Sequence, residues 1–199
     1  AAAQLATVGV DLDTMKREGV VELPDPNFQY GTPKFKTPSG KFEFSSEAVG
    51  AAGLNPVIGW IPRKVTPKDG EFAIVGGKQG IHSHTMTQNI ACLNAISREY
   101  HMERLWISAQ DAEDLGVQTG DTVEVASSEH VGQVEARVTQ RLKPGVVFLP
   151  THYGGDSPAQ TRAYRYGIAL TDFIPFDMEP GVGSMMSQEV AVTVKKVEA

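Results

Sequence analysis

The sequence predicts a mainly β protein: a small mixed barrel with short helices, preceded by an irregular N-terminal arm. Three observations predict this fold. From residue 71 onward, short apolar runs of strand length alternate with turn residues. Few stretches have helical spacing, and four prolines between residues 24 and 38 argue against regular structure there. The 199 residues, 41% of them apolar, are enough to enclose one substantial core. We therefore expect an arm over residues 1–70 and a barrel over residues 71–199.

The arm is expected to contain one short helix and a hairpin. Residues 11–19 have helical character, and Asp11 or Asp13 can accept hydrogen bonds at the N-terminus. A turn at residues 38–40 precedes alternating Phe42 and Phe44, which predicts a short strand whose two aromatic rings pack in a core. The rest of the arm is expected to be a linker whose partner surface lies elsewhere.

The barrel strands are expected where apolar residues cluster or alternate. These runs cover residues 71–77, 104–108, 119–127, 131–140, 143–150 and 189–197. One helix is predicted just after the second run, with Ser108 as its N-cap, Asp111 at the capping-box position and Gly116 at its end. A Gly-rich loop follows residue 150, and a long irregular segment, 154–189, precedes the closing strand.

Composition excludes several classes of function. A formal net charge of −6 at pH 7 argues against nucleic-acid binding, which requires a broad basic face. No apolar run reaches the roughly 18 residues of a membrane span, so no direct membrane contact is expected. The single cysteine, Cys92, excludes internal disulfides and multi-cysteine metal centres within the chain. Its apolar neighbours predict that Cys92 is buried.

The stretch GIHSHTMTQN, residues 80–89, gathers two histidines, three hydroxyls and two amides. One interpretation is a metal site, because His82 and His84 would share one face of a strand. That site lacks two further ligands nearby and matches no metalloprotease helix motif. A small zinc hydrolase that uses His82, His84 and His152 is a further possibility.

A ligand cradle is the interpretation that these residue types favour. Their side chains offer donors and acceptors without fixed charge, which suits a heterocycle with amide and amine edges joined to phosphates. Lys78 can add a charge-assisted contact to a phosphate. A second polar cluster, THYGGDSPAQTRAYRYG at residues 151–167, brings Arg162 and Arg165, although a solvated loop would explain it equally well. Neither VGGKQG nor GVGSMM fits a phosphate-loop or nucleophile motif.

Three stretches together resemble the C-terminal region of the molybdopterin-dependent oxidoreductases of the dimethyl sulfoxide reductase family. They are FKTPSGKFEFSSE at residues 35–47, GKQGIHSHTMTQN at residues 77–89, and LWISAQDAEDLGVQTGDTVEVAS at residues 105–127 followed by KPGVVFLPTHYGG. The resemblance covers residues 32–197. It implies a six-stranded double-psi β-barrel that binds molybdopterin guanine dinucleotide, with molybdenum or tungsten held by the parent enzyme.

The resemblance also implies which residues contact the cofactor. Together with Lys78 they are His82, His84, Thr85, Thr87, Gln88, Asn89, His152, Tyr153, Gly154 and Asp172. In the closing stretch, Thr171 replaces a family asparagine while Asp172 is retained. No catalytic residue and no metal ligand is expected within the chain.

The chain departs from the family pattern because it contains neither a four-cysteine iron–sulfur motif nor a recognisable metal ligand. We therefore expect a piece of an enzyme that is not catalytic alone, with any iron–sulfur cluster in an N-terminal part outside this chain. The family implies as partners the remaining enzyme domains, iron–sulfur electron-transfer subunits and membrane-anchor subunits, and it favours a periplasmic location. Within the family, the stretch HSHTMTQN and the closing stretch of the chain are most similar to those of thiosulfate, polysulfide and tetrathionate reductases. The alternative is a freestanding double-psi barrel that acts as a binding or adaptor module without molybdenum.

Overall fold

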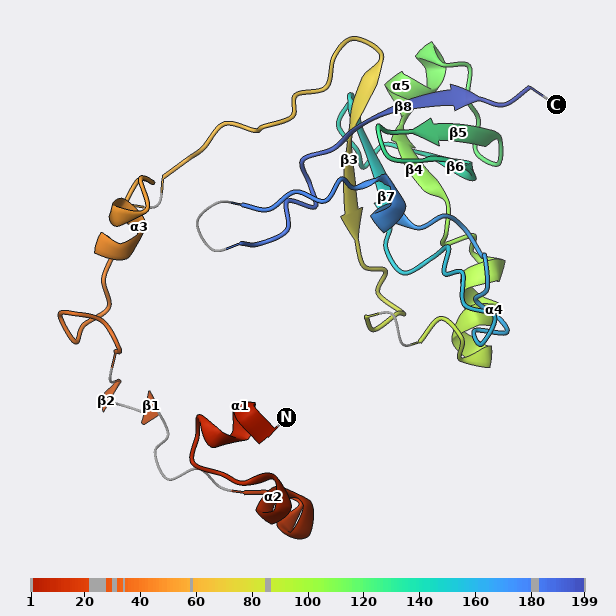
Figure 1. Ribbon diagram of the computed structural model, residues 1–199. Coiled ribbons are helices and arrows are strands. Elements are labelled where there is room, and N and C mark those ends of the chain that lie inside the picture. The colour runs from red at the N-terminus through yellow and green to blue at the C-terminus, as the bar shows by residue number, and fades with distance from the viewer. Residues whose placement is uncertain are drawn as a thin grey trace. The chain divides into compact units, whose positions relative to one another are not determined.

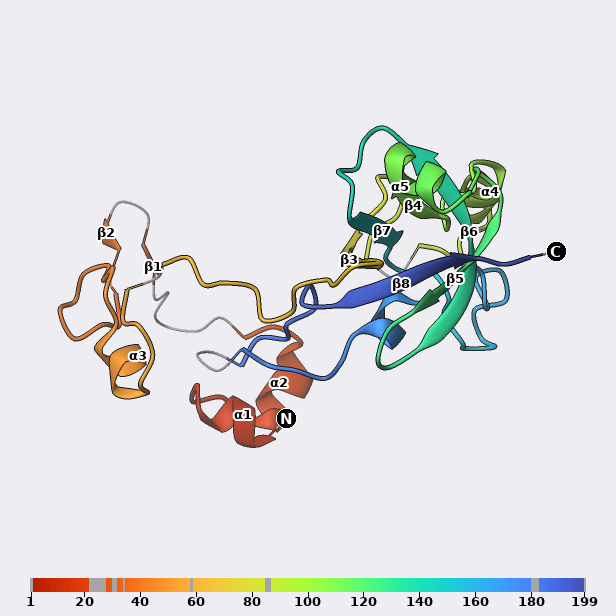
Figure 2. The same ribbon diagram turned by 90° about the horizontal axis from the view of Figure 1, so that it is seen from above.

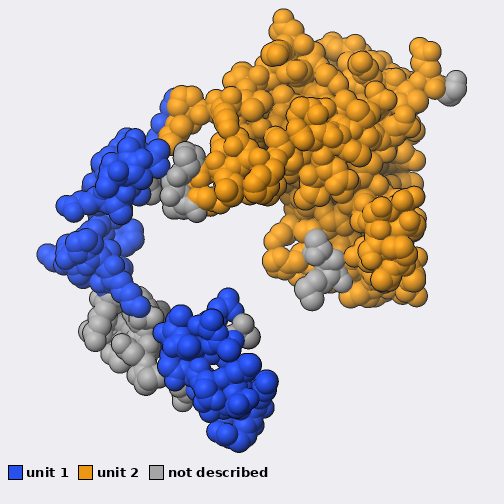
Figure 3. Space-filling model, viewed as in Figure 1, with its two compact units in different colours: residues 1–60 blue, residues 61–199 orange. Residues whose placement is uncertain are grey.

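The computed structural model describes residues 2–21, 28–29, 32–33, 35–57, 59–84, 87–179 and 183–198. The chain divides into two compact units, residues 1–60 and residues 61–199, which are coloured separately in Figure 3. None of the described helices is long and apolar enough to cross a membrane.

Unit 1 contains short elements with few buried residues. Its helices are α1 (Ala2–Ala6), α2 (Leu12–Glu18) and α3 (Glu47–Ala51), and β1 (Phe28–Gln29) pairs antiparallel with β2 (Thr32–Pro33). The helix predicted at residues 11–19 is confirmed. The carboxylate of Asp11 accepts a hydrogen bond from the amide of Thr14 at 2.8 Å, and Gly19, with φ +72°, ends the helix.

The strand predicted at Phe42 and Phe44 is wrong. The two side chains are 63% and 83% exposed, and the nearest strand-like contact is a single bridge between Ser45 and Val57. The ring of Phe42 meets Phe35 and Phe44 edge-on instead, with centroids 5.9 and 5.2 Å away. Within the described part of unit 1, this stretch has no second strand to pair with, so its alternation does not create a buried face.

Unit 2 is built around a closed barrel of six strands (Figure 1). The strands are β3 (Glu71–Gly77), β4 (Leu105–Ser108), β5 (Thr122–Ala126), β6 (Val131–Thr139), β7 (Val146–Pro150) and β8 (Ala191–Lys196). Their order around the barrel is β3-β7-β4-β6-β5-β8. The pairs β3–β7 and β4–β6 are parallel and the other four are antiparallel.

The pairing has an internal twofold symmetry. Replacing β3, β4 and β5 by β6, β7 and β8 maps the parallel pair β3–β7 onto β6–β4 and the antiparallel pair β3–β8 onto β6–β5. The pairs β4–β7 and β5–β8 map onto themselves. A closed six-stranded barrel with two symmetry-related parallel crossovers is a double-psi β-barrel, so the predicted fold is confirmed.

Alternation along the strands forms the barrel core. On β5, Val123 and Val125 are buried, and the strands opposite contribute equally apolar inward positions. The fully inaccessible core side chains include Leu105, Ile107, Val123, Val125, Val147, Leu149 and Phe173. The barrel is therefore closed by side chains, and any ligand must bind at an end or on a rim.

Helix α5 (Ala109–Asp114) packs beside β4 and has the predicted cap. The hydroxyl of Ser108 accepts a hydrogen bond from the amide of Asp111 at 3.1 Å and donates to its carboxylate at 2.7 Å. Gly116, with φ +64°, follows the helix end. The Asp111 carboxylate also accepts from the amide of Gly145 at 3.0 Å, so the cap fixes the turn that leads into β7.

Helix α4 (Ala91–Glu99) was not predicted. It lies beside the long loop that follows β7, and Figure 1 shows it well separated from α5, although both helices lie on the same side of the barrel when seen from above (Figure 2). Its two buried residues, Asn94 and Ser97, are polar, whereas Ile96 is 37% exposed. The buried face of α4, which packs against loops, is therefore polar, and apolar side chains lie on its exposed face. This is the reverse of an ordinary amphipathic helix. Cys92 is exposed on this helix, and the expectation that it is buried was wrong for the same reason.

Candidate functional site

A cavity of about 570 Å³ lies where the parallel strands β3 and β7 end. Gly76, Gly77 and Lys78 line it from the end of β3. The loop after β7 and the 3-10 helix η1 (Leu170–Phe173) provide the rest of the lining, which is Thr151, His152, Tyr153, Gly155, Gln160, Ala169, Leu170 and Thr171. The volume is in the range of small-molecule and cofactor sites.

Glycines allow the backbone segments around this cavity to approach closely. A Cβ atom on Gly76 would lie 2.0 Å from Cδ2 of Leu170, and one on Gly77 would lie 2.8 Å from the ring of Phe148. Gly154 has φ +75°, and a Cβ there would lie 2.2 Å from the amide nitrogen of Ala169. A side chain at any of these positions would displace the wall of the cavity.

His82 is a supporting residue of this region. It is 6% exposed, and its ring nitrogens lie 3.1 Å from the hydroxyl of Thr87 and 2.5 Å from the hydroxyl of Ser97. The Thr87 hydroxyl also accepts a hydrogen bond from the amide of Ser83 at 3.0 Å. Burial lowers the pKa of His82, so the imidazole is neutral at pH 7.

These contacts argue against the metal alternatives for the polar stretch. Both nitrogens of His82 are engaged by hydroxyls, which leaves none for a metal ion. His84 is exposed with φ +50°, in a turn rather than a strand, so the shared strand face assumed for the pair does not exist. The zinc hydrolase that would use His82, His84 and His152 loses its first ligand.

His152 lies on the cavity wall among basic groups. Burial lowers its pKa, and electrostatic interactions with Lys78, then His84 and His82, lower it further. The Nε2 atom of His152 is buried and has no hydrogen-bond partner among the described residues. An anion with acceptor oxygens would satisfy both the unpaired ring nitrogen and the local positive charge.

Gln88 and Asn89 are adjacent and differ in their surroundings. Gln88 is 3% exposed, and neither its amide nitrogen nor its amide oxygen has a partner within the described part of the chain. A buried carboxamide without hydrogen bonds is costly, so a bound polar group would stabilise it. The Oδ1 atom of Asn89, in contrast, accepts hydrogen bonds from the amides of Arg162 at 2.8 Å and Ala163 at 3.3 Å. Asn89 therefore fixes a loop.

Tyr153 connects the cavity to α4. It is 5% exposed, its hydroxyl lies 3.3 Å from that of Ser97, and its ring meets His82 edge-on at 5.9 Å. Burial raises the pKa of Tyr153, so the phenol stays protonated.

The residues expected to contact a cofactor thus separate into groups. Lys78, His152 and Tyr153 line the cavity, with Gly154 next to them in the chain. His82, Thr87 and Asn89 make hydrogen bonds within the protein, and Gln88 is buried with no partner for its side-chain amide among the described residues. His84 is exposed close enough to His152 to lower its pKa. Asp172 is exposed on η1 outside the lining, whereas its neighbour Thr171 lies within it. Thr85 lies outside the described residues.

Sequence reasoning missed the supporting residues of α4. Arg98 donates to the carbonyl of Arg162 at 2.9 Å and to the amide oxygen of Asn94 at 3.0 Å, and it stacks over the ring of Tyr166 at 4.1 Å. Asn94 and Ser97 lie three residues apart on one helix face. That polar pair at helical spacing is the signal that could have revealed them.

The family described as the molydopterin dinucleotide binding domain has a model that matches residues 72–183. The chain belongs to this family. The match spans the barrel strands from β3 to β7, the cavity and all of the residues expected to contact the cofactor. The expected resemblance to molybdopterin-dependent enzymes is therefore confirmed.

Relatives of this molydopterin dinucleotide binding domain are larger proteins. The thiosulfate reductase molybdopterin-containing subunit PhsA of Salmonella typhimurium is 26% identical over 176 residues, which cover 87% of this chain and 22% of PhsA. The F420-dependent formate dehydrogenase subunit alpha of Methanocaldococcus jannaschii is 34% identical over 91 residues, 46% of this chain and 13% of that protein. The chain thus spans less than a quarter of each of these two relatives.

A solved structure shows the same fold in another large protein. Acetylene hydratase from Pelobacter acetylenicus aligns with a TM-score of 0.68 at 13% sequence identity, over 97% of this chain and 28% of the hydratase chain. At this identity the likeness concerns the fold alone.

Proposed function

We propose that residues 71–199 bind molybdopterin guanine dinucleotide at the cavity between β3, β7 and η1. The observation that carries this proposal is the set of buried polar atoms without partners in the described part of the chain. Of the three residues concerned, His152 lines the cavity, and Gln88 belongs to the stretch expected to contact a cofactor. The family match supports a dinucleotide of molybdopterin, and the guanine base is our inference from the resemblance.

The residues of the chain would have distinct roles toward this cofactor. Lys78 would provide a charge-assisted contact to a phosphate oxygen, and Nε2 of His152 would hydrogen-bond to the same anionic region. The amide of Gln88 offers both donors and an acceptor, as the edge of a heterocycle requires. When bound, the cofactor holds the molybdenum or tungsten that supplies the redox chemistry. The chain itself binds and orients the cofactor and is not catalytic alone.

Binding of guanosine diphosphate tests the nucleotide half of the proposal. The wild-type chain and the variants Lys78→Ala and His152→Gln would be titrated with guanosine diphosphate by calorimetry. Each variant is expected to bind about tenfold more weakly, since a hydrogen bond to a charged group contributes about 1.5 kcal/mol or more. Lys143→Ala and His130→Gln are matched controls, because both side chains are exposed and neither lines the cavity.

Two results would count against this proposal. Equal affinity of all four variants would show that the cavity does not hold the phosphates. Equal affinity for cytidine diphosphate would show that the base is not recognised. In the full-length parent enzyme, loss of extractable pterin in the Lys78→Ala and His152→Gln variants, but not in the controls, would extend the test to the whole cofactor.

We further propose that the parent enzyme reduces a sulfur compound of the thiosulfate, polysulfide or tetrathionate type. The similarity to PhsA across 87% of the chain supports this, whereas the match to the formate dehydrogenase covers 46%. Assays of the parent enzyme with a reduced dye should show turnover of at least one of these substrates. Turnover of formate or dimethyl sulfoxide alone would contradict the proposal.

In this proposal, residues 1–70 are an arm that contacts the remaining domains of the parent enzyme. Those domains would carry the iron–sulfur cluster, and iron–sulfur electron-transfer and membrane-anchor subunits would be further partners. Copurification with the tagged parent enzyme would test these partners. The alternative, a freestanding adaptor barrel without molybdenum, is supported by the barrel topology alone and does not explain the family match.

A further inference from the structure

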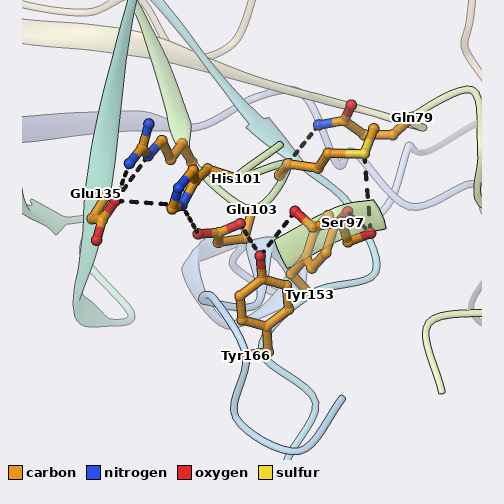
Figure 4. A network of polar contacts seen from close by, with 9 residues as sticks. Gln79, Ser97, His101, Glu103, Glu135, Tyr153 and Tyr166 are labelled. Atoms are coloured by element: carbon orange, nitrogen blue, oxygen red, sulfur yellow. Dashed lines mark hydrogen bonds and ion pairs between the residues drawn. The ribbon is translucent and has the colours of Figure 1, made fainter. Parts of the chain in front are cut away.

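A second group of potential ligands lies outside the cavity, near the start of β4 (Figure 4). Nδ1 of His101 is 3.8 Å from Oε1 of Glu103 and 4.0 Å from Oε2 of Glu135. Ligand atoms of the three residues all lie within 4.8 Å of one another, and no other group of three His, Cys, Asp or Glu in the described ranges does so. The three come from the turn after α4, the approach to β4, and β6.

We propose that His101, Glu103 and Glu135 form a binding site for a divalent metal ion of the zinc type. Three ligand atoms that all lie within 4.8 Å of one another can share an ion about 2.8 Å or less from each, which is within an ångström of zinc–ligand distances. The side chains of His101 and Glu135 are 49% and 43% exposed, so both have room to close this gap.

The combination of one imidazole and two carboxylates determines the class of metal. Calcium and magnesium prefer oxygen ligands alone, whereas imidazole nitrogen favours zinc and its first-row neighbours. Three protein ligands leave a fourth position for water, and the exposure of His101 provides access for the ion.

Both carboxylates have outer hydrogen-bond donors, as ligating carboxylates usually do. The phenol of Tyr166 donates to Oε2 of Glu103, so Oε1 is the oxygen that faces His101 (Figure 4). Arg104 donates to Oε2 of Glu135 from Nε at 2.8 Å and from a terminal nitrogen at 2.6 Å. A carboxylate has about four lone-pair positions, two on each oxygen, so Tyr166 and Arg104 leave Oε1 of each carboxylate for a metal ion.

The burial of Glu103 favours a cation beside its carboxylate. Glu103 is 8% exposed, and its Oε1 lies 3.8 Å from the imidazole, which is too far for a hydrogen bond. A buried carboxylate is stable only when it is paired and hydrogen-bonded. An ion between Glu103 and His101 would place a positive charge beside Oε1 of Glu103, and it would also tie the end of α4 to the barrel.

Zinc titration of the full chain tests the site. Calorimetry with zinc chloride is expected to show one site in the wild type and at least tenfold weaker binding in both His101→Ala and Glu135→Gln. His130→Ala is the matched control, because this exposed histidine lies on the turn between β5 and β6. Bound zinc should raise the melting temperature of the wild type and of His130→Ala, but not that of His101→Ala.

The variants are chosen at exposed positions so that they keep the fold, which circular dichroism would verify. Cobalt gives a second readout, since its visible absorption reports tetrahedral nitrogen and oxygen ligands and should be lost in His101→Ala. Absence of zinc binding to the wild type would overturn the proposal. Equal zinc affinity in His101→Ala, Glu135→Gln and the control would also overturn it, because the ion would then bind elsewhere.

Discussion

Nε2 of His82 lies 2.5 Å from the hydroxyl of Ser97, and this contact joins the polar stretch after β3 to the inner face of α4. Both residues are buried, at 6% and 1% exposure. The Ser97 hydroxyl is also 3.3 Å from that of Tyr153, which lines the cavity. A single serine therefore connects helix α4 to two residues expected to support the cofactor.

Ser97→Ala should lower the free energy of unfolding by about 1–3 kcal/mol, because it leaves a buried imidazole nitrogen without a partner. Urea unfolding of the full chain measures this. Ser128→Ala, at an exposed position in the turn after β5, should change it by less than about 0.5 kcal/mol. Equal effects of the two substitutions would show that the His82–Ser97 contact contributes nothing.

The stability of unit 2 should decrease as the pH falls below about 6.5, the ordinary pKa of histidine. Burial lowers the pKa values of His82 and His152 in the folded state, so the unfolded chain takes up protons first. Stability is then complete above the unfolded pKa and is lost as the pH falls toward the folded pKa. Urea unfolding between pH 5 and pH 8 measures the slope.

The variant His82→Gln separates this histidine effect from general acid destabilisation. Its stability should depend less steeply on pH than that of the wild type, whatever its stability at pH 8. His130→Gln is the control, because His130 is exposed outside this stretch and does not line the cavity, so the wild-type slope should remain. If the stability of His82→Gln depends on pH as steeply as that of the wild type, His82 does not cause the loss of stability at low pH.

Gly154→Ala should destabilise the fold far more than Gly145→Ala. The two glycines have similar backbone angles, with φ +75° and +79°, so both substitutions cause the same kind of backbone strain. A Cβ on Gly154 would lie 2.2 Å from the amide nitrogen of Ala169, whereas one on Gly145 would have no atom within 4 Å. The difference should be about 1–3 kcal/mol in thermal or urea unfolding. No difference would show that the close approach at Gly154 relaxes freely.

The regular elements of the barrel were predictable because their signals are local. Val123 and Val125 alternate on a half-buried strand, and Ser108 with Asp111 forms a cap within four residues. The strand expected at Phe42 and Phe44 failed because alternation creates a buried face only where a partner strand is present.

The support around the cavity was hidden because it consists of contacts between residues distant in sequence. The Asn89 side chain reaches the amide of Arg162, 73 residues away, and Arg98 reaches the carbonyl of Arg162, 64 residues away. The residue types near position 85 correctly indicated dense hydrogen bonding. They could not show that His82 and Thr87 use their hydrogen bonds within the protein while the side-chain amide of Gln88 finds no partner in the part of the chain that the structure describes.

Asn89→Ala should release part of the loop between residues 155 and 166 without unfolding the barrel. The substitution removes the acceptor of the Arg162 and Ala163 amides, while the barrel strands keep all their contacts. The free energy of local opening should fall by about 1 kcal/mol, so hydrogen exchange at these two amides should become about fivefold faster. Amides of β5 and β6 should exchange as in the wild type. In Asn55→Ala, which removes a comparable acceptor in unit 1, exchange at Arg162 should not change. If exchange accelerates throughout the barrel of Asn89→Ala, the side chain supports the whole unit and not one loop.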